Sequence, residues 1–171
     1  MIMKTCFVGD MDTEAIFDAN EVHARSLDER QHAAIDRLRS GGNLWLATAS
    51  DGQGPHLIPV SFWWDGSRLT TSTFERSRTL NNVQAQPRVR ASIGSTTDVL
   101  MIDATAAVVP GSEIDPAAAE GYARASRIPQ STPGFIYMQL APDRVQVWKG
   151  PAEFAGRTVM RAGAWLDEPI D

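Results

Sequence analysis

Hydrophobic and polar positions alternate along much of the chain between residues 43 and 150. The alternation is clearest in "RVRASIG", where Val89, Ala91 and Ile93 are expected to face a core and the residues between them to face solvent. A period of two is the pattern of a half-buried β-strand. It recurs in "NLWLATAS", "HLIPVSFWW", "RLTTST", "DVLMIDATAAVV", "FIYMQLAP" and "DRVQVWKG". The pattern therefore predicts a mainly β fold of about six or seven short strands, and closure into a barrel removes their exposed edges.

Short turn signals join these strands. Asp65 and Gly66 stand between the second and third strands and are typical of a tight hairpin. Pro59 lies inside the second strand and predicts either a bulge or a sheet edge there, because proline cannot donate a hydrogen bond to a neighbouring strand. No linker or repeat divides the chain, so a single domain over residues 1–171 is expected.

Helices are expected around this sheet. The N-terminal segment, residues 1–42, is expected to be helical, with a first helix carrying Ile16, Phe17 and Val22 and a second one after the capping box "SLDE". A short helix is expected from about Arg76 to Gln86, and another after "DP" at residues 115–116. The C-terminal tail, residues 151–171, is interpreted as loop or short helix.

Composition excludes several classes of protein. The 171 residues carry a formal net charge of −5, which argues against nucleic-acid binding through the overall field. No apolar run approaches the roughly 20 residues that a membrane helix needs, and the start does not resemble a signal peptide. Cys6 is the only cysteine, so the simplest expectation is a reducing, cytoplasmic location. One cysteine and three scattered histidines predict no metal site.

Candidate chemistry concentrates in "TTSTFERSRTLNNVQAQPRVRASIG", residues 70–94. A strand ends there and a helix begins, with Arg76, Arg78 and several hydroxyl groups at the junction. The first N–H groups of a helix have no internal partner and carry partial positive charge. Together with Ser77 and Thr79, they would suit a phosphate. A simpler interpretation is that Ser77 only caps the helix and that the arginines are solvated.

Three segments in this order resemble the pyridoxamine 5′-phosphate oxidase-like, FMN-binding split-barrel family, over residues 44–150. "HLIPVSFWWDGSRL" resembles the paired strands under the flavin ring. "STFERSRTLNNVQAQPRV" resembles the phosphate segment, in which Ser77 and Pro87 keep the family spacing. "LAPDRVQVWKG" is similar to the last-strand pattern, with Trp148 and Gly150 in place.

The resemblance implies a Greek-key split barrel with peripheral helices that forms a homodimer, with FMN at the subunit interface. It implies an oxidoreductase in which the flavin carries hydride or electron transfer for a small-molecule substrate, with a nicotinamide donor as a candidate partner. No catalytic residue is named, because this chemistry needs no protein general base. The implied cofactor-binding residues are His56, Val60, Ser61, Ser72, Thr73, Arg76, Ser77, Arg78, Thr79, Asn82 and Trp148. Among them Ser77, Arg78 and Thr79 would hold the phosphate. Trp148 would border the ring, either from the same subunit or from the other one.

The chain departs from the oxidases proper at several places. Thr79 stands where they carry lysine, with Arg76 as the candidate substitute, and His56 stands where they carry arginine. The tail lacks their substrate-phosphate pattern, which argues against pyridoxamine phosphate as substrate. Two alternatives stay open: a deazaflavin-dependent reductase, with a wider groove that uses Arg124 and Arg127, and a non-catalytic flavin- or haem-binding protein.

Tryptophans outside these motifs have simpler expected roles. Trp45 and Trp165 are assigned to packing. Trp63 and Trp64 are neighbours on one strand and therefore point to opposite faces of the sheet. One of the two is expected in the core and the other at a barrel face or a dimer surface.

Overall fold

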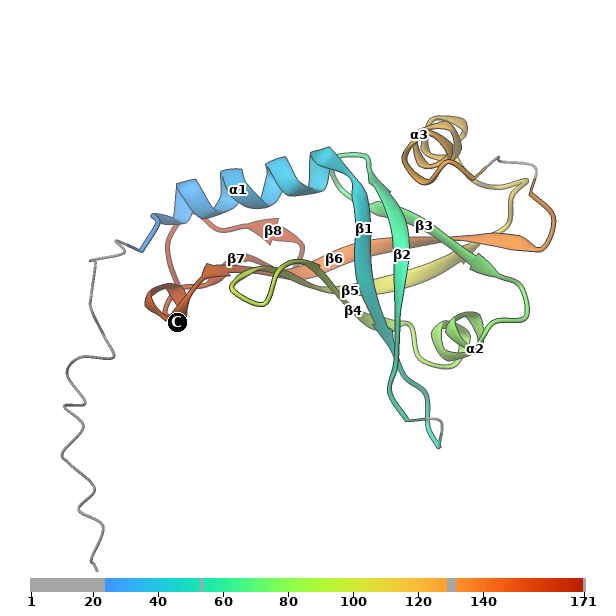
Figure 1. The fold of residues 1–171 in the computed structure, drawn as a ribbon, viewed down its shortest axis with the longest axis horizontal. Helices are drawn as coiled ribbons and strands as arrows, with labels where there is room; N and C mark the ends of the chain where they lie inside the picture. The colour runs from blue at the N-terminus through green and yellow to red at the C-terminus, as the bar shows by residue number, and fades with distance from the viewer. Residues whose placement is uncertain (1–23, 53, 129–131, 171) are drawn as a thin grey trace, which may run out of the picture.

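The computed structural model describes residues 24–52, 54–128 and 132–170 (Figure 1). The expected helix around Ile16, Phe17 and Val22 lies outside the described residues. In chain order the elements are α1 (Leu27–Ser40), β1 (Gly42–Thr48), β2 (His56–Trp64), β3 (Leu69–Phe74), α2 (Arg78–Ala85), β4 (Arg88–Gly94), β5 (Asp98–Val109), α3 (Pro116–Ser126), β6 (Phe135–Lys149), the 3-10 turn η2 (Pro151–Glu153), β7 (Thr158–Arg161) and β8 (Ala164–Trp165).

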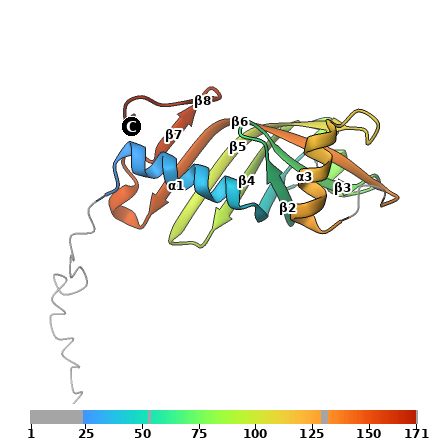
Figure 2. The same ribbon diagram turned by 90° about the horizontal axis from the view of Figure 1, so that it is seen from above.

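All strands of the described residues belong to one antiparallel sheet in the order β3-β2-β1-β4-β5-β6-β7-β8. An additional pairing of β3 with β6 closes the first six strands into a barrel, with a register from Leu69 opposite Leu140 to Phe74 opposite Phe135. Helix α1 runs along one side, whereas α2 and α3 lie at the end of the barrel away from β7 and β8 (Figures 1 and 2). The predicted mainly β barrel with peripheral helices is therefore confirmed.

The core follows from the predicted alternation. Leu46, Ala91, Ile102 and Val145 lie in register across β1, β4, β5 and β6, and each is at most 1% exposed. Burial of each such side chain stabilises the fold by roughly 1–3 kcal/mol. "FIYMQLAP" and "DRVQVWKG" are not two strands but the single strand β6, which continues across a register shift opposite Asp103.

The C-terminal tail was expected to be loop or short helix, and this prediction holds for η2 but is wrong for residues 158–165. There β7 and β8 form a hairpin that extends the sheet beyond β6. Thr158, Val159 and Met160 are all buried, so the alternation that marks a strand is missing. The strand forms because other parts of the fold bond its backbone groups. For example, the side-chain amide of Gln31 on α1 donates a hydrogen bond to the carbonyl of Val159 at 3.3 Å.

Strand β2 is a partial edge of the sheet. Only Trp63 and Trp64 pair with β3, so Pro59 has a strand neighbour on one side alone, where it lies opposite Trp45 of β1. The edge alternative for Pro59 is therefore confirmed. Between its start and Trp63, β2 has no partner on the side of β3, and the barrel is open there. The backbone of the first half of β2 is therefore available on that side.

Helix α3 packs across β2 and β3. An added Cβ at Gly121 would lie 2.3 Å from Cε2 of Trp63, so the helix approaches the strand too closely for any side chain. The hydroxyl of Tyr122 lies 2.8 Å from Oγ of Ser72 on β3. Trp63 thus lies under α3 while Trp64 packs against the barrel core, as opposite faces require. None of the helices in the described part of the chain has the length and apolarity to span a membrane.

Candidate cofactor-phosphate site

The junction of β3 and α2 is built around the hydroxyl of Ser77. Its Oγ accepts the backbone N–H of Leu80 at 3.0 Å and lies 2.8 Å from Oγ1 of Thr73. Ser77 is therefore the N-cap, and the helix begins at Arg78 rather than at Arg76. A helix cap and a phosphate site are compatible, because the cap satisfies only one of the first N–H groups.

Thr79 is turned toward β2. Its side chain is buried, and Oγ1 lies 3.1 Å from Nε2 of His56 at the start of that strand. Its backbone N–H makes no hydrogen bond to any residue that the structure describes. Thr79 can therefore offer an anion its backbone N–H, while its hydroxyl joins the helix to β2.

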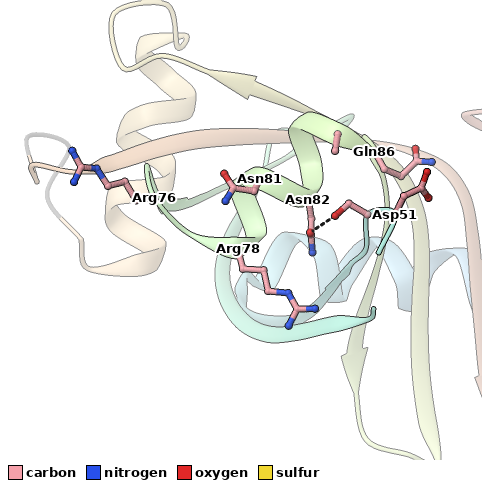
Figure 3. A pocket seen from close by; sticks show the side chains of 8 residues that line it. Asp51, Arg76, Arg78, Asn81, Asn82 and Gln86 are labelled. Carbon is pink, nitrogen blue, oxygen red and sulfur yellow. Dashed lines mark hydrogen bonds between the residues drawn. The ribbon is translucent and has the colours of Figure 1, made fainter. Parts of the chain in front are cut away.

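The two arginines at this junction diverge. The Nη2 atom of Arg78 donates to the carbonyl of Gly54 at 3.2 Å, in the turn between β1 and β2. Arg76 extends away from Arg78 on the other side of the helix start (Figure 3). Both side chains are exposed. Of the two, Arg78 is the first residue of the helix, and its side chain reaches the turn between β1 and β2.

An open cavity of about 640 Å³ adjoins α2 (Figure 3). This volume lies within the usual range for small-molecule sites. Arg76 and Arg78 supply positive charge at its wall, and Asp51 supplies the negative charge. Four polar lining residues were not predicted from the sequence: Ser50, Asp51, Asn81 and Gln86. Ser50 and Asp51 belong to the polar turn that follows β1, whereas Asn81 and Gln86 belong to α2 and its C-cap, and no local sequence signal indicates that the two segments meet.

Asn82 connects α2 to the end of β1. Its side-chain amide donates to Oγ1 of Thr48 at 3.1 Å, and its carbonyl oxygen accepts the hydroxyl of Ser50 at 2.8 Å. The side chain is only 1% exposed. These bonds hold the helix against the barrel, and its terminus keeps a fixed position relative to β2.

The other predicted residues of β2 and β3 lie along the opening of the barrel. The carbonyl of Ser61 accepts a hydrogen bond from Oγ1 of Thr71 at 2.8 Å. The hydroxyl of Ser61 donates to Oδ1 of Asn43 at 2.9 Å. Val60 packs partly against the core. Ser72 is buried and lies beside Tyr122 on α3, a neighbour that the sequence did not reveal. The carbonyl and the hydroxyl of Ser61 are therefore both already bonded within the chain.

Trp148 does not lie in this corner of the molecule. It is opposite Val99 near the far end of β6, whereas β3 meets α2 next to Phe135 at the start of that strand. The separation along the strand is roughly 40 Å at the usual rise per residue. The Trp148 ring instead has its edge against Phe154, with 6.3 Å between ring centres. Trp148 can therefore border a cofactor at α2 only from a second copy of the chain.

The site offers anion-binding chemistry rather than metal ligation. No cluster of three or more histidine, cysteine or carboxylate side chains occurs among residues 24–52, 54–128 and 132–170. The backbone at the start of α2, the guanidinium of Arg78 and the open edge of β2 could together hold a phosphorylated, flat molecule.

Comparison with known proteins shows which family this chain resembles. The family model described as Pyridoxamine 5′-phosphate oxidase matches residues 27–149. None of the curated proteins matches the sequence. A putative pyridoxamine 5′-phosphate oxidase from Listeria innocua is 21% identical, covers 71% of this chain and 98% of its own, and superimposes with a TM-score of 0.55.

Two further solved structures have the same fold. An F420 reductase is 20% identical, with 64% of this chain and 93% of its own covered and a TM-score of 0.53. The haem-storage protein HutZ from Vibrio cholerae is 16% identical, with 75% and 100% covered and a TM-score of 0.57. Proteins of different activity thus share this barrel.

Proposed function

Because this chain belongs to the pyridoxamine 5′-phosphate oxidase family, we propose that it binds FMN and works as an oxidoreductase on a small-molecule substrate. When bound, the flavin supplies the hydride or electron transfer, and the protein binds it, orients it and tunes it. The observation that carries the proposal is the start of α2, where Ser77 caps the helix and the next residue, Arg78, lines an open cavity.

The phosphate of FMN would lie at this helix terminus. The backbone N–H groups of the first turn point out of the helix, and the partial positive charge of the terminus favours an anion. Thr79 contributes its N–H, Arg78 contributes a planar guanidinium, and Ser77 fixes the geometry through its cap to Leu80. Arg76 would add charge from the side.

The ring would lie along the open edge of β2, near Val60 and Ser61. Backbone groups of an unpaired edge can bond the polar rim of a flat heterocycle, but the carbonyl of Ser61 already accepts a hydrogen bond from Oγ1 of Thr71. His56 would stand between the phosphate and this edge, held by Thr79. Ser72 and Thr73 would line the end of β3. Backbone N–H donors there would stabilise negative charge that develops on the ring.

The functional unit would be a cytoplasmic homodimer of single-domain chains, with the cofactor at the subunit interface. Trp45 and Leu57 are 50% and 58% exposed and lie on adjacent strands, where Trp45 is opposite Pro59 and Leu57 opposite Ala47. Side chains that alternate in this register share the outer face of the sheet. An exposed apolar surface of this kind is typical of an interface with another chain, and a partner could bring its Trp148 to the cofactor.

Two other functions are compatible with the fold. A deazaflavin-dependent reductase is supported by the likeness to the F420 reductase. Its longer coenzyme would extend toward Arg124 and Arg127, but Arg124 is paired with Glu120 at 2.7 Å. A non-catalytic flavin- or haem-binding protein is supported by the likeness to HutZ. The α2 site suits a phosphate more directly than it suits a haem.

The test is to purify the protein and identify what acid releases, then to titrate it with FMN, deazaflavin and haem. Release of FMN, and reduction of the bound flavin by a nicotinamide donor, support the proposal. A crystal grown with FMN should show the phosphate beside Arg78 at the start of α2. A bound phosphate at any other place would overturn this assignment.

A further inference from the structure

The cavity beside α2 is much larger than a phosphate group needs. Its volume of about 640 Å³ is typical of sites that enclose a whole small molecule. Arg78, Asn81, Asn82 and Ala85 line it, and their spacing places them on one face of the helix. The cavity is therefore a groove that follows α2 from its first residue to its last, over about 10 Å.

The opposite wall of this groove is the turn between β1 and β2. Ser50 and Asp51 line the groove from this turn. The hydroxyl of Ser50 donates to the side-chain oxygen of Asn82 at 2.8 Å, and this bond holds the turn against the helix. The two walls are thus joined to each other within one chain, so the groove is formed before any ligand enters it.

Opposite charges are separated along the groove. Arg76 and Arg78 stand where α2 begins, whereas Asp51 and Gln86 lie on the side away from Arg76 (Figure 3). Asp51 is exposed and has no hydrogen bond or ion pair to any residue within 24–52, 54–128 and 132–170. Its carboxylate can therefore accept hydrogen bonds from a ligand, and it would repel a ligand that is anionic along its whole length.

Neutral groups complete the groove. The side-chain amide of Asn81 is exposed and has no partner among the described residues. The side-chain carbonyl of Gln86 accepts the backbone N–H of Arg88 at 3.3 Å, which leaves its NH₂ group as a donor. Amides of this kind pair with the edge of adenine, and a carboxylate accepts the hydroxyl groups of a ribose. The groove thus combines an anion site at one end with groups that suit a nucleoside at the other.

We propose that the flavin site extends along this groove and that the chain holds FAD, with the adenosine monophosphate half between α2 and the β1–β2 turn. The inference rests on the proposed function, because the flavin half keeps the place proposed for FMN. The second phosphate would lie near Arg78, and the ribose hydroxyls would bond Asp51. The adenine would lie along Ala85, with its edge toward the amides of Asn81 and Gln86.

Isothermal titration calorimetry of the native chain with FAD and with FMN tests this inference. FAD should bind about tenfold more tightly than FMN, because the adenosine half adds hydrogen bonds with the groove. If neither flavin binds, the proposed function and this inference both fail. If FMN binds with an affinity equal to or higher than that of FAD, this inference alone is overturned and the flavin site stands.

Two variants locate the adenosine half. Asp51→Ala should weaken FAD binding about tenfold, since a hydrogen bond to a charged group is lost, while FMN affinity stays within about twofold. Ala85→Trp fills the groove from an exposed position and should also weaken the binding of FAD alone. Asp36→Ala, which removes an exposed carboxylate from α1, is the control. Unchanged FAD affinity in either groove variant, or an equal loss for FMN, would place the adenosine half outside the groove. Thermal melts establish that each variant is folded.

Discussion

Oγ1 of Thr79 lies 3.1 Å from Nε2 of His56, which joins the first turn of α2 to the start of β2. Thr79 and His56 are the two positions at which the chain departs from the lysine and arginine of the oxidases that it resembles. The two departures therefore contact each other. A threonine and a histidine replace a lysine and an arginine in this corner, so a phosphate bound here would draw its positive charge from Arg78, Arg76 and the helix terminus.

This contact gives a prediction for Thr79→Val, which removes the hydroxyl and keeps the shape of the side chain. Loss of the hydrogen bond to His56 should lower the free energy of unfolding by about 1 kcal/mol in a denaturant titration. FMN affinity should change less than threefold, because only the backbone N–H of Thr79 would face the phosphate. Thr105→Val, at an exposed position of β5, is the control. A loss of FMN affinity above tenfold would instead place the hydroxyl on the phosphate.

Glu153 should make part of the stability depend on pH. Hydrogen bonds from Arg25 at 2.7 Å outweigh the cost of burial and lower the pKa of its carboxyl from 4.5 to about 2. A carboxyl whose pKa is lowered by folding stabilises the fold above its ordinary pKa, and the contribution is lost as the pH falls. We expect a loss of about 3 kcal/mol between roughly pH 5 and pH 2.

Glu153→Gln isolates this effect, because other carboxylates titrate equally in both proteins. The variant should be about 2–3 kcal/mol less stable at pH 7, and the difference from the native chain should shrink toward pH 2. Glu120→Gln, in an exposed pair with Arg124, should change stability by less than about 0.5 kcal/mol. A difference that is constant between pH 7 and pH 2 would show that Glu153 does not titrate with a lowered pKa.

Gly121 should tolerate no side chain. The Cβ of Gly121→Ala would lie 2.3 Å from the Trp63 ring, so α3 must shift away from β2. Alanine is the better helix former, yet overpacking of this kind costs about 1–3 kcal/mol, and a net destabilisation should appear in thermal melts. Gly111→Ala is the control, because nothing lies within 4 Å of its added Cβ. A Gly121→Ala variant as stable as the native chain would contradict the close contact of α3 with Trp63.

The apolar outer face of β1 and β2 should mediate self-association. Trp45→Glu places a charge on this face and should convert a dimer to a monomer in sedimentation equilibrium, because burial of an unpaired charge is costly. The unfolding free energy of the monomer should be nearly unchanged, since the side chain is half exposed. Ser40→Glu, at the exposed end of α1, should leave the dimer intact. Dimers of equal affinity in both variants would exclude this face as the interface.

The strands could be predicted because alternation is a local pattern that the barrel obeys. The β7–β8 hairpin could not, because three consecutive buried residues carry no period. Trp45 was assigned to packing, and within this chain that assignment is wrong, since the side chain is half exposed. Leu44 and Leu46, on either side of Trp45, are core residues, so the alternation already predicted that Trp45 lies on the outer face. Trp165 does pack against the core.

The candidate site was predictable only in part. The strand-to-helix junction at Ser77 follows from local signals, and its cap is confirmed. The polar wall from Ser50, Asp51 and Gln86 depends on how the β1–β2 turn meets α2, which no local pattern encodes. The divergence of Arg76 and Arg78 likewise depends on where the helix begins. Their roles toward a cofactor remain predictions.

The most direct test compares FMN with riboflavin, which lacks the phosphate, in the native chain and in Arg78→Gln. Both ligands are titrated by flavin fluorescence, with Arg39→Gln on α1 as the control. If the phosphate lies at the start of α2, FMN should bind the native chain at least tenfold more tightly than riboflavin. Arg78→Gln should then reduce FMN affinity about tenfold to a hundredfold while riboflavin affinity stays within about twofold. An equal loss for both ligands, or no preference for FMN in the native chain, would contradict a phosphate site at Arg78.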